Sequence, residues 1–533
     1  MDNKKLNGIY YTPTLLADFV IKYIFEEYTF NKEINILEPS CGDGVFINSL
    51  TAFSKSKDFN FNISLVEIDK KELSKIENNN KGKYKNIRFS YYSQDFLMFQ
   101  VNNKKKYDLI IGNPPYINKR YMSSEQVEIG NKILEDLNVS PSTIKNIWIA
   151  FLVSATASLN EDGVLCFVLP SEILQVNHSS SIRNYLLNNF HSIEIFTFNE
   201  IIFENIEQDT IVFIGSKKAN KKGFHYHSVK KLLDINTNSL NTISYNELIN
   251  IDEKWTSLLL GQSVLEKINY LKKNIQPVSD YCSSSTGIVT AANDDFIITD
   301  DALDKFKLHK FAHPIIKKSS YIKNLINFKI DDFNKLKNGN ATNLLLFNGE
   351  EKNTNENVED YLQALIEKGI TERYKFKKRN IWYIIPSVWQ SEGFFFKRSH
   401  LYPKVIINTA NVSVTDTAYR IKMKENFNIN SFTFSFYNSL TLVFAEMYGR
   451  FYGGGVLELT PNEFKKLPIP YLEVSPKQLN ELDEMFRSGK DFNSILDYTN
   501  NIVLRKGLGF SDYEIELLDS TRLLLINRRL KSK

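Results

Sequence analysis

The chain has 533 residues, more than one hydrophobic core usually holds, so at least two domains are expected. Hydrophobic residues make up 42% and charged residues 24%, a balance that excludes a disordered or fibrous chain. The 66 Lys and Arg against 62 Asp and Glu leave a net charge of +4, so any nucleic-acid footprint must be local.

The cysteines and the apolar runs bear on the compartment. Cys41, Cys166 and Cys282 lie too far apart for a disulfide framework or a cysteine zinc site, which predicts a reducing, cytoplasmic setting. No apolar run follows residues 1–10, so no signal peptide is expected. The longest apolar stretch, 147–159, is too short to cross a bilayer. These features predict a cytoplasmic protein without a membrane segment.

The N-terminal part alternates helical and strand patterns. Thr12-Pro13 predicts the start of a helix, with Thr12 as its N-cap, because apolar residues then recur at helical spacing. A later strand, 210–214, suits a sheet edge or an antiparallel partner. Further helices are expected at 70–77, 148–159 and 180–188. Buried strands are expected at 34–37, 63–66, 87–91, 109–112, 163–169 and 193–198.

This alternation over residues 1–225 predicts a doubly wound α/β domain, in which ligands bind beyond the carboxyl ends of the strands. Polar residues then predict a linker at 226–250. Residues 251–472 mix strand and helix patterns and indicate an α+β domain. Residues 473–533 predict a helical region.

The first chemical motif is the turn after strand 34–37, where Gly42 and Gly44 let a ligand approach the backbone closely. A purely structural turn is an alternative. The acidic Glu38 and Asp43 disfavour a bound phosphate and favour a ligand with an ammonium or sulfonium charge.

Two further strand ends carry acids. Glu67 ends strand 63–66 at the distance from the glycine turn where an acid accepts hydrogen bonds from ribose, and Ile68 beside it suits an adenine face. Asp95-Phe96 follows strand 87–91, where Asp95 suits an adenine amine and Phe96 its ring. The alternatives are a helix N-terminal acid for Glu67 and a helix N-cap for Asp95.

The fourth motif is Asn113-Pro114-Pro115-Tyr116, directly after strand 109–112. The two prolines end the strand and fix the backbone, so the carbonyls here are not used in a ladder. An amide side chain on a rigid strand end, followed by an aromatic ring, suits a planar amine or amide. A plain proline turn is the alternative.

Together these motifs resemble the class I S-adenosylmethionine-dependent methyltransferases, specifically the gamma-class DNA adenine-N6 methyltransferases. The family has a Thr-Pro box before its first strand, and residues 8–13 match it; the motif order along the chain is also that of the family. The resemblance implies a Rossmann-like methyltransferase domain at 1–225 and a target-recognition domain at 251–472.

The resemblance also implies roles. Asn113, Pro114, Pro115 and Tyr116 would be catalytic, and Phe203 in the 202–205 segment would complete the clamp on a flipped base. The cofactor S-adenosylmethionine would be bound by Tyr11, Thr12, Glu38, Pro39, Ser40, Cys41, Gly42, Glu67, Ile68, Asp95, Phe96, Pro115 and Phe151. Covalent cytosine methylation would need a Pro-Cys pair, which the chain lacks, so Cys41 is not expected to be a nucleophile.

The second half resembles the family more loosely. Residues 286–296 are similar to a Gly-Ile-x-Thr-Gly element of the recognition region, with Ala291 in place of the second glycine, and 458–470 are similar to its end. Between them a basic cluster alternates with aromatic residues. Its cations, predicted to bind DNA phosphates, are Arg373, Lys375, Lys377, Lys378 and Arg379. A solvated face is the alternative.

No metal site is predicted, since the seven histidines show no ligand spacing and His225 and His227 are interpreted as a surface pair. The predicted function is methylation of adenine N6 in double-stranded DNA within a restriction–modification or epigenetic system. A separately encoded endonuclease and a monomer on DNA are the expected partner and state. Two rivals stay open: an RNA or protein-glutamine N-methyltransferase, and a catalytically idle DNA-binding partner.

Overall fold

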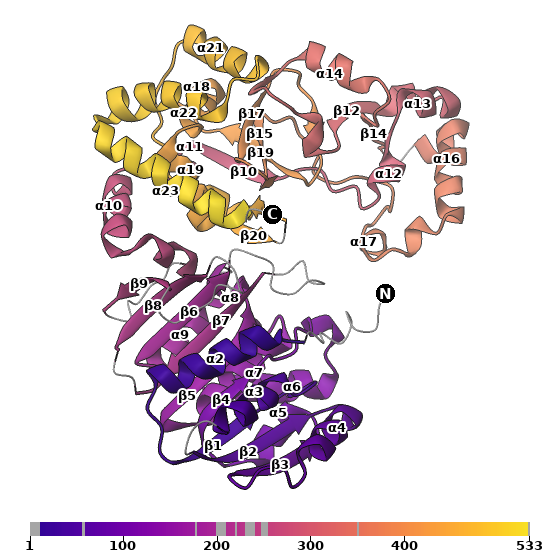
Figure 1. The fold of residues 1–533 in the computed structure, drawn as a ribbon. Helices are drawn as coiled ribbons and strands as arrows, with labels where there is room; N and C mark the ends of the chain where they lie inside the picture. The colour runs from indigo at the N-terminus through magenta and orange to yellow at the C-terminus, as the bar shows by residue number, and fades with distance from the viewer. Residues whose placement is uncertain are drawn as a thin grey trace. The chain divides into compact units, whose positions relative to one another are not determined.

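The computed structural model describes residues 11–55, 59–175, 179–198, 209–218, 221–229, 240–246, 254–348, 351–452 and 454–530. It divides into two compact units, each described here by itself. The first holds residues 1–267 with 452–454 and 531–533, and the second holds 268–451 and 455–530 (Figure 1).

A nine-stranded sheet runs through the described part of the first unit, in the order β3-β2-β1-β4-β5-β7-β6-β8-β9. Strands β1 to β5 pair in parallel, whereas β7 lies antiparallel between β5 and β6. The strands are β1 Glu33–Glu38, β2 Asn60–Glu67, β3 Ile87–Ser93, β4 Tyr107–Gly112, β5 Leu159–Pro170, β6 Ser192–Phe198, β7 Thr210–Ser216, β8 Gly223–Val229 and β9 Asn241–Tyr245. The predicted doubly wound fold is confirmed, and β7 is an antiparallel partner inside the sheet, not at its edge.

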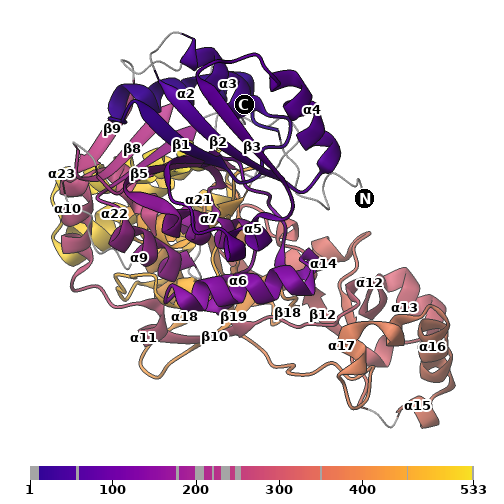
Figure 2. The ribbon, with the colours of Figure 1, turned by 90° about the horizontal axis from the view of Figure 1, so that it is seen from below.

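Helices cover both faces of this sheet. Helices α2, α3 and α4 lie on one face, and α5, α6, α7 and α9 lie on the other (Figure 2). The helices are α2 Thr14–Glu27, α3 Val45–Ser54, α4 Lys70–Asn80, α5 Phe96–Asn102, α6 Ser124–Asp136, α7 Ile147–Ala157, α8 Glu172–Gln175 and α9 Ser180–Asn189. Helix α2 begins two residues after Thr12, which corrects the predicted N-cap: the Thr12 side chain makes no capping bond to α2, and its hydroxyl accepts from Asn113, the residue after β4.

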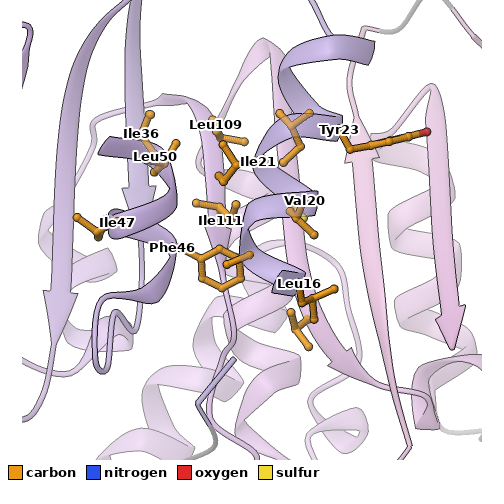
Figure 3. Close-up of a cluster of buried hydrophobic side chains, with 14 of the residues drawn as sticks. Leu16, Val20, Ile21, Tyr23, Ile36, Phe46, Ile47, Leu50, Leu109 and Ile111 are labelled. Carbon is orange, nitrogen blue, oxygen red and sulfur yellow. The ribbon is translucent and has the colours of Figure 1, made fainter. Parts of the chain in front are cut away.

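The core of the first unit forms where α2 and α3 pack on the central strands. Leu16 and Val20 of α2 and Phe46 of α3 meet Ile36 and Ile111 of β1 and β4, all buried (Figure 3). Burying side chains of this size contributes roughly 1.5–3 kcal/mol each. This packing fixes β1 and β4 as neighbours at the point where the strand order reverses.

The sheet continues past the boundary predicted at residue 225. Strand β8 pairs in parallel with β6, and β9 pairs antiparallel with β8, so both lie partly or wholly in the segment interpreted as a linker. His225 and His227 of β8 are buried, which corrects their interpretation as a surface pair. Their Nδ1 atoms bond Ser244 and Thr242 of β9, so a strand with a polar sequence lies inside the fold.

The second unit combines several small sheets with helices. The described sheets have the strand orders β10-β19-β15-β17-β13, β11-β14-β12-β18 and β16-β21-β20. The strands are β10 Cys282–Thr286, β11 Ile297–Ile298, β12 Ala312–Ile316, β13 Asn327–Phe328, β14 Asn343–Leu345, β15 Gly393–Phe396, β16 Arg398–Ser399, β17 Lys404–Asn408, β18 Ser413–Val414, β19 Ala418–Met423, β20 Arg450–Tyr452 and β21 Val456–Glu458.

The helices of this half begin with α10 Gln262–Lys272, which spans the division between the units. The others are α11 Val278–Tyr281, α12 Asn293–Phe296, α13 Asp300–Phe306, α14 Ile330–Lys337, α15 Glu351–Thr354, α16 Glu356–Glu367, α17 Tyr374–Lys377, α18 Ile429–Phe436, α19 Ser439–Tyr448, α20 Pro461–Lys465, α21 Pro476–Arg487, α22 Phe492–Asn500 and α23 Asp512–Leu530. The helical character predicted for the last residues is therefore present, and the α+β class predicted for this half is confirmed.

Candidate functional site

The four chemical motifs lie at one edge of the first sheet. Glu38 ends β1, Glu67 ends β2, Asp95 follows β3 and Asn113 follows β4. Because these four strands are parallel and adjacent, their carboxyl ends meet at the same edge. The strand order reverses between β1 and β4, which is where α/β sheets of this kind bind ligands.

The turn after β1 brings backbone close to this edge. Gly42 and Gly44 have φ values of +50° and +78°, in the left-handed region that glycine adopts without strain. The Gly44 N–H donates to the Cys41 carbonyl at 2.7 Å, and the Cys41 N–H donates to the Val66 carbonyl at 3.2 Å. A Cβ on Gly44 would lie 3.1 Å from Ile76, so the turn packs tightly against α4.

Glu67 holds this turn in place. Its carboxylate accepts the Gly42 N–H and the Asp69 N–H, each at 2.9 Å. The helix-capping alternative belongs to Asp69, whose side chain accepts from the first turn of α4. Ile68 between them is 67% exposed, an unusual position for its side chain beside a buried strand end. A ribose and an adenine face fit this pair of residues.

Glu38 has a buried carboxylate that needs a partner. Its side chain is 1% exposed, and Oε2 finds no hydrogen-bond partner among the described residues. Burial, together with the nearby Asp43 and Glu67 carboxylates, raises the pKa of Glu38 well above its ordinary value. A cationic ligand would satisfy both the orphaned oxygen and the excess of negative charge. The residues therefore fit the amino and sulfonium groups of S-adenosylmethionine.

Asp95 takes the capping role and has a second contact. Its side chain caps α5 by accepting the Leu97 N–H at 2.8 Å, and its other oxygen accepts from Gln126 Nε2 at 2.8 Å. Phe96 and Phe151 are both buried, with ring centroids 4.7 Å apart. The structure thus brings together the two aromatic residues that the sequence assigned to the adenine pocket, and it adds Gln126.

The Asn113–Tyr116 segment is tied to the N-terminal residues. Asn113 Nδ2 donates to Thr12 Oγ1 at 3.2 Å, and Ser40 Oγ donates to the Asn113 carbonyl at 3.2 Å. Tyr116 is 8% exposed and its hydroxyl donates to the Val168 carbonyl at 3.2 Å. These bonds orient the Asn113 amide at the strand end and hold the Tyr116 ring on β5.

The remaining predicted site residues complete this edge. Tyr11 lies over the glycine turn, since a Cβ on Gly42 would stand 3.7 Å from its ring. Pro39 lies against the end of β4, since a Cβ on Gly112 would stand 3.3 Å from Pro39. Pro115 is half-buried and Pro114 is buried. Phe203 and the rest of 202–205 lie outside the described residues.

The three cysteines are buried thiols. Cys41, Cys166 and Cys282 are free and buried. Burial, with the Glu38 and Glu67 carboxylates beside it, raises the pKa of the Cys41 thiol, so a thiolate is disfavoured there. Among the described residues no group of three or more His, Cys, Asp or Glu could hold a metal ion.

In the second unit, the basic cluster divides into engaged and exposed cations. Arg379 donates to the carbonyls of Trp382, Val289 and Thr290 at 2.9–3.1 Å. Lys377 Nζ lies 2.7 Å from Glu372, and Arg373 lies 4.0 Å from Asp295. Lys375 is exposed, and Lys378 lies 4.6 Å from the centre of the Tyr374 ring, itself 72% exposed.

The engaged arginine connects the cluster to the 286–296 element. Val289 and Thr290 directly precede Ala291, whose φ is +70°. The position where the family resemblance implies a second glycine therefore has the conformation that glycine favours. Arg379 thus braces a strained turn, which sequence spacing alone did not indicate.

Two family models and a relative match most of the chain. Residues 31–203 match the family model described as Eco57I restriction-modification methylase, and residues 252–504 match that of the C-terminal domain of Type II methyltransferase M.Eco57I. Type II methyltransferase M.AccI of Acinetobacter calcoaceticus is 24% identical over 523 residues, covering 94% of this chain and 92% of that protein.

Other relatives match smaller parts or only the fold. M.HincII of Haemophilus influenzae is 25% identical over 290 residues, which are 53% of this chain and 51% of that protein. The solved Type IIL restriction-modification enzyme MmeI in complex with DNA aligns with a TM-score of 0.59 at 15% identity, over 92% of this chain and 73% of that one, and it shows the fold alone.

The first unit thus has the fold of a class I S-adenosylmethionine-dependent methyltransferase, and its site residues fit that cofactor. The two family matches and the full-length similarity to M.AccI identify the chain as a DNA methyltransferase of restriction–modification type. Within the described part of the chain, no helix is both long and apolar enough to span a membrane.

Proposed function

We propose that this methyltransferase acts on the N6 amine of an adenine flipped out of double-stranded DNA. The observation that carries the proposal is the position of Asn113–Tyr116 at the same sheet edge as Glu38, Glu67 and Asp95. A planar amine presented at this strand end faces an amide and a proline carbonyl on a rigid backbone. A target inside a duplex reaches such a site only by leaving the stack.

The chemistry follows from the hydrogen-bonding capacity of the strand end. The adenine amine is a weak nucleophile because its lone pair is delocalised into the ring. The Asn113 side-chain oxygen and the Pro114 carbonyl would accept its two hydrogens, which favours the tetrahedral nitrogen and the positive charge that develops there. Thr12 and Ser40 support this role by bonding the Asn113 side chain and backbone. The cofactor, when bound, supplies an electrophilic methyl group on a sulfonium.

The cofactor would occupy the carboxyl edge beside this strand end. Glu38 would bind the cationic amino-acid end, with Thr12, Pro39, Ser40 and Cys41 around it. Glu67 would accept from the ribose hydroxyls, Asp95 from the adenine amine, and Ile68, Phe96 and Phe151 would flank the base. Tyr11, Gly42 and Pro115 would line the remaining wall. This assignment is supported by the orphaned Glu38 oxygen and by the exposed Ile68.

The aromatic clamp on the target base is proposed from Tyr116 and Phe203. Tyr116 follows the catalytic prolines directly, and its ring is held by the bond to Val168. An aromatic face contributes roughly 1–3 kcal/mol of stacking with one base. We assign the first unit, whose sheet continues through β9 to Tyr245, to catalysis, 251–472 to target recognition and 473–533 to a helical region.

DNA binding by the recognition region is proposed to use its basic cluster. Lys375 and Lys378 are the exposed candidates for phosphate contacts, and Arg373 and Lys377 would join them on exchanging their acidic partners for phosphates. Arg379, which already binds three carbonyls, would hold the turn at Val289–Ala291 in position. A separately encoded endonuclease of the same specificity, action as a monomer and a cytoplasmic location complete the proposal.

The test is to identify the methylated product. Incubation with methyl-labelled cofactor should place label on double-stranded DNA, and digestion of that DNA to nucleosides should yield N6-methyl-2′-deoxyadenosine. Label on N4 of cytosine would contradict the adenine assignment. Label on RNA or protein but not DNA would favour the rival N-methyltransferase, and no label on any of the three would favour an idle DNA-binding partner.

A further inference from the structure

Gln126 is a side chain outside the methyltransferase motifs that contacts one of the proposed cofactor ligands. It lies in the first turn of α6, and its Nε2 donates to Asp95 Oδ2 at 2.8 Å. Asp95 Oδ1 accepts the Leu97 N–H at 2.8 Å. The carboxylate is therefore held from two helices, α5 and α6, and cannot rotate without losing one of these bonds.

The orientation of the Gln126 amide is set by its other end. Its Oε1 accepts the Ser123 N–H at 3.0 Å, while its own backbone N–H donates to Ser123 Oγ at 3.1 Å. This is a capping box at the start of α6. A backbone N–H can only donate and a carboxylate can only accept, so reversing the amide would break both contacts.

We propose that Gln126 is a specificity-determining positioning residue for the cofactor base. Gln126 and the Leu97 N–H each donate to one oxygen of Asp95, which fixes the carboxylate and leaves its remaining acceptor lone pairs, of about four, to the pocket. A purine with a 6-amino group donates to such an acceptor, whereas a purine with a 6-oxo group meets it with another acceptor. The inference rests on the proposed role of Asp95 in binding adenine.

This inference differs from a purely structural role in what it predicts for ligand choice. A capping box stabilises α6 whatever the cofactor, so its loss changes folding stability and not the preference between two bases. The bond to Asp95 changes that preference. Gln126→Glu separates the two roles, because a glutamate keeps the capping box and replaces the donor facing Asp95 with an acceptor.

The experiment compares S-adenosylhomocysteine with S-inosylhomocysteine by calorimetry, using the full-length protein without DNA. Wild type should prefer the adenine form. Gln126→Glu should lower affinity for S-adenosylhomocysteine roughly tenfold or more, the effect of one charge-assisted hydrogen bond. It should lower the adenine preference by a similar factor, because Asp95 then loses the Gln126 donor that holds its carboxylate towards the 6-amino group.

Three matched variants make the result decisive. Ser123→Ala should lower the melting temperature and leave the base preference unchanged. Gln126→Met, uncharged and of similar length, should reduce the preference as well, and it decides the matter if Gln126→Glu does not fold. Asp95→Ala should remove the preference altogether.

Two outcomes would overturn the inference. A wild-type preference in both Gln126 variants, with Asp95→Ala impaired, would remove Gln126 from ligand selection while leaving Asp95 in place. A wild-type preference in Asp95→Ala would overturn the roles of both residues. Neither result bears on the methylated product, since no DNA is present, so failure here is distinct from failure of the proposed adenine-N6 activity.

Discussion

The two proposed binding regions of the molecule use their charged side chains in opposite ways. At the carboxyl edge of the first sheet, the buried Glu38 Oε2 has no partner among the described residues, and we propose that it binds the cofactor. In the 373–379 segment, Arg379 binds three carbonyls of its own unit and Lys377 binds Glu372. Three of the five cations at 373–379 thus contact groups of their own unit, whereas the single acid Glu38 has an oxygen open to a ligand.

The difference shows what makes a motif informative. Parallel strands force the residues after them to one edge, so acids and an amide at four strand ends must converge. No such constraint acts on cations along a loop and a short helix, where each side chain finds whatever partner packing supplies. Replacements at the two regions should therefore have different signatures.

The largest effect is expected at Asn113. Asn113→Ala should lower kcat for methyl transfer by on the order of 10²–10³-fold, because its oxygen matters most as charge develops on the amine. Binding of S-adenosylhomocysteine should stay within about twofold of wild type, since this oxygen serves the reaction more than cofactor binding. Single-turnover transfer of labelled methyl groups measures the first effect and calorimetry the second. Near wild-type turnover would exclude Asn113 from the reaction.

Arg379 should behave as a structural residue despite its place in the basic cluster. Arg379→Ala leaves the Val289, Thr290 and Trp382 carbonyls without their donor and should lower the unfolding free energy of the second unit by roughly 2–3 kcal/mol. Thermal unfolding of the full chain measures this. Lys375→Ala is the control and should unfold as wild type does; equal destabilisation in both would contradict the distinction.

Glu38 should link cofactor binding to stability. Its pKa is raised in the folded state, so the folded chain binds more protons than the unfolded one above the ordinary glutamate pKa, and stability falls as pH rises through that range. Glu38→Gln should gain on the order of 1 kcal/mol at pH 7, with the difference closing below about pH 4. It should also weaken binding of S-adenosylmethionine by roughly 1–3 kcal/mol.

Denaturant unfolding at several pH values, with calorimetry at neutral pH, tests both halves of that expectation. A variant that is less stable at pH 7 would mean that Glu38 is ionised and satisfied in the absence of ligand. Unchanged affinity for the cofactor would mean that the orphaned oxygen does not face it.

The exposed lysines should report on DNA phosphates. Lys375→Ala with Lys378→Ala should weaken binding on all sequences alike and reduce the magnitude of the log-affinity against log-salt slope by roughly 0.9 for each phosphate left without its lysine. The methylated motif should not change, since phosphate binding carries no sequence information. Fluorescence anisotropy over a salt series measures the slope, and an unchanged slope would indicate a solvated surface.

The smallest effect is expected at Ala291. Its φ of +70° costs an L-residue roughly 1 kcal/mol relative to glycine, so Ala291→Gly should stabilise the second unit by up to about that amount. The neighbouring Ala292, with a negative φ of −150°, is the matched control, and Ala292→Gly should destabilise. A decrease in stability in Ala291→Gly would mean that the Ala291 backbone carries no strain for glycine to relieve.

Much of the first unit could be predicted from the sequence because its signals are local. The runs at 34–37, 63–66 and 109–112 are mostly apolar, with Asn35 and Ser64 as exceptions, as is typical of buried parallel strands, and each is followed by a residue with a predicted chemical role. The convergence of Glu38, Glu67 and Asn113 follows from that pattern alone. Pro13 likewise marks the start of α2.

The parts that escaped prediction depend on distant partners. Strand β8 contains His225 and His227 and so has a polar sequence, yet both rings are buried and their Nδ1 atoms bond Ser244 and Thr242 of the next strand. Gln126 meets Asp95 across 31 positions, and Arg379 meets Val289 across 90. Such pairings arise from packing between distant segments, and no periodicity or short spacing in the sequence predicts them.

The contacts of helix α2 bear on the order in which the first unit folds during synthesis. Just before α2 begins, Thr12 accepts a hydrogen bond from Asn113. In its later turns, Tyr23 donates to Glu194 at 2.5 Å, a partner 171 residues away that also binds His227. In a growing polypeptide, the Tyr23 side of α2 therefore lacks its polar partner until β6 has been made, because interactions so distant in sequence form late. The contacts that Glu194 makes with Tyr23 and His227 can therefore all form only after some 227 residues have been synthesised.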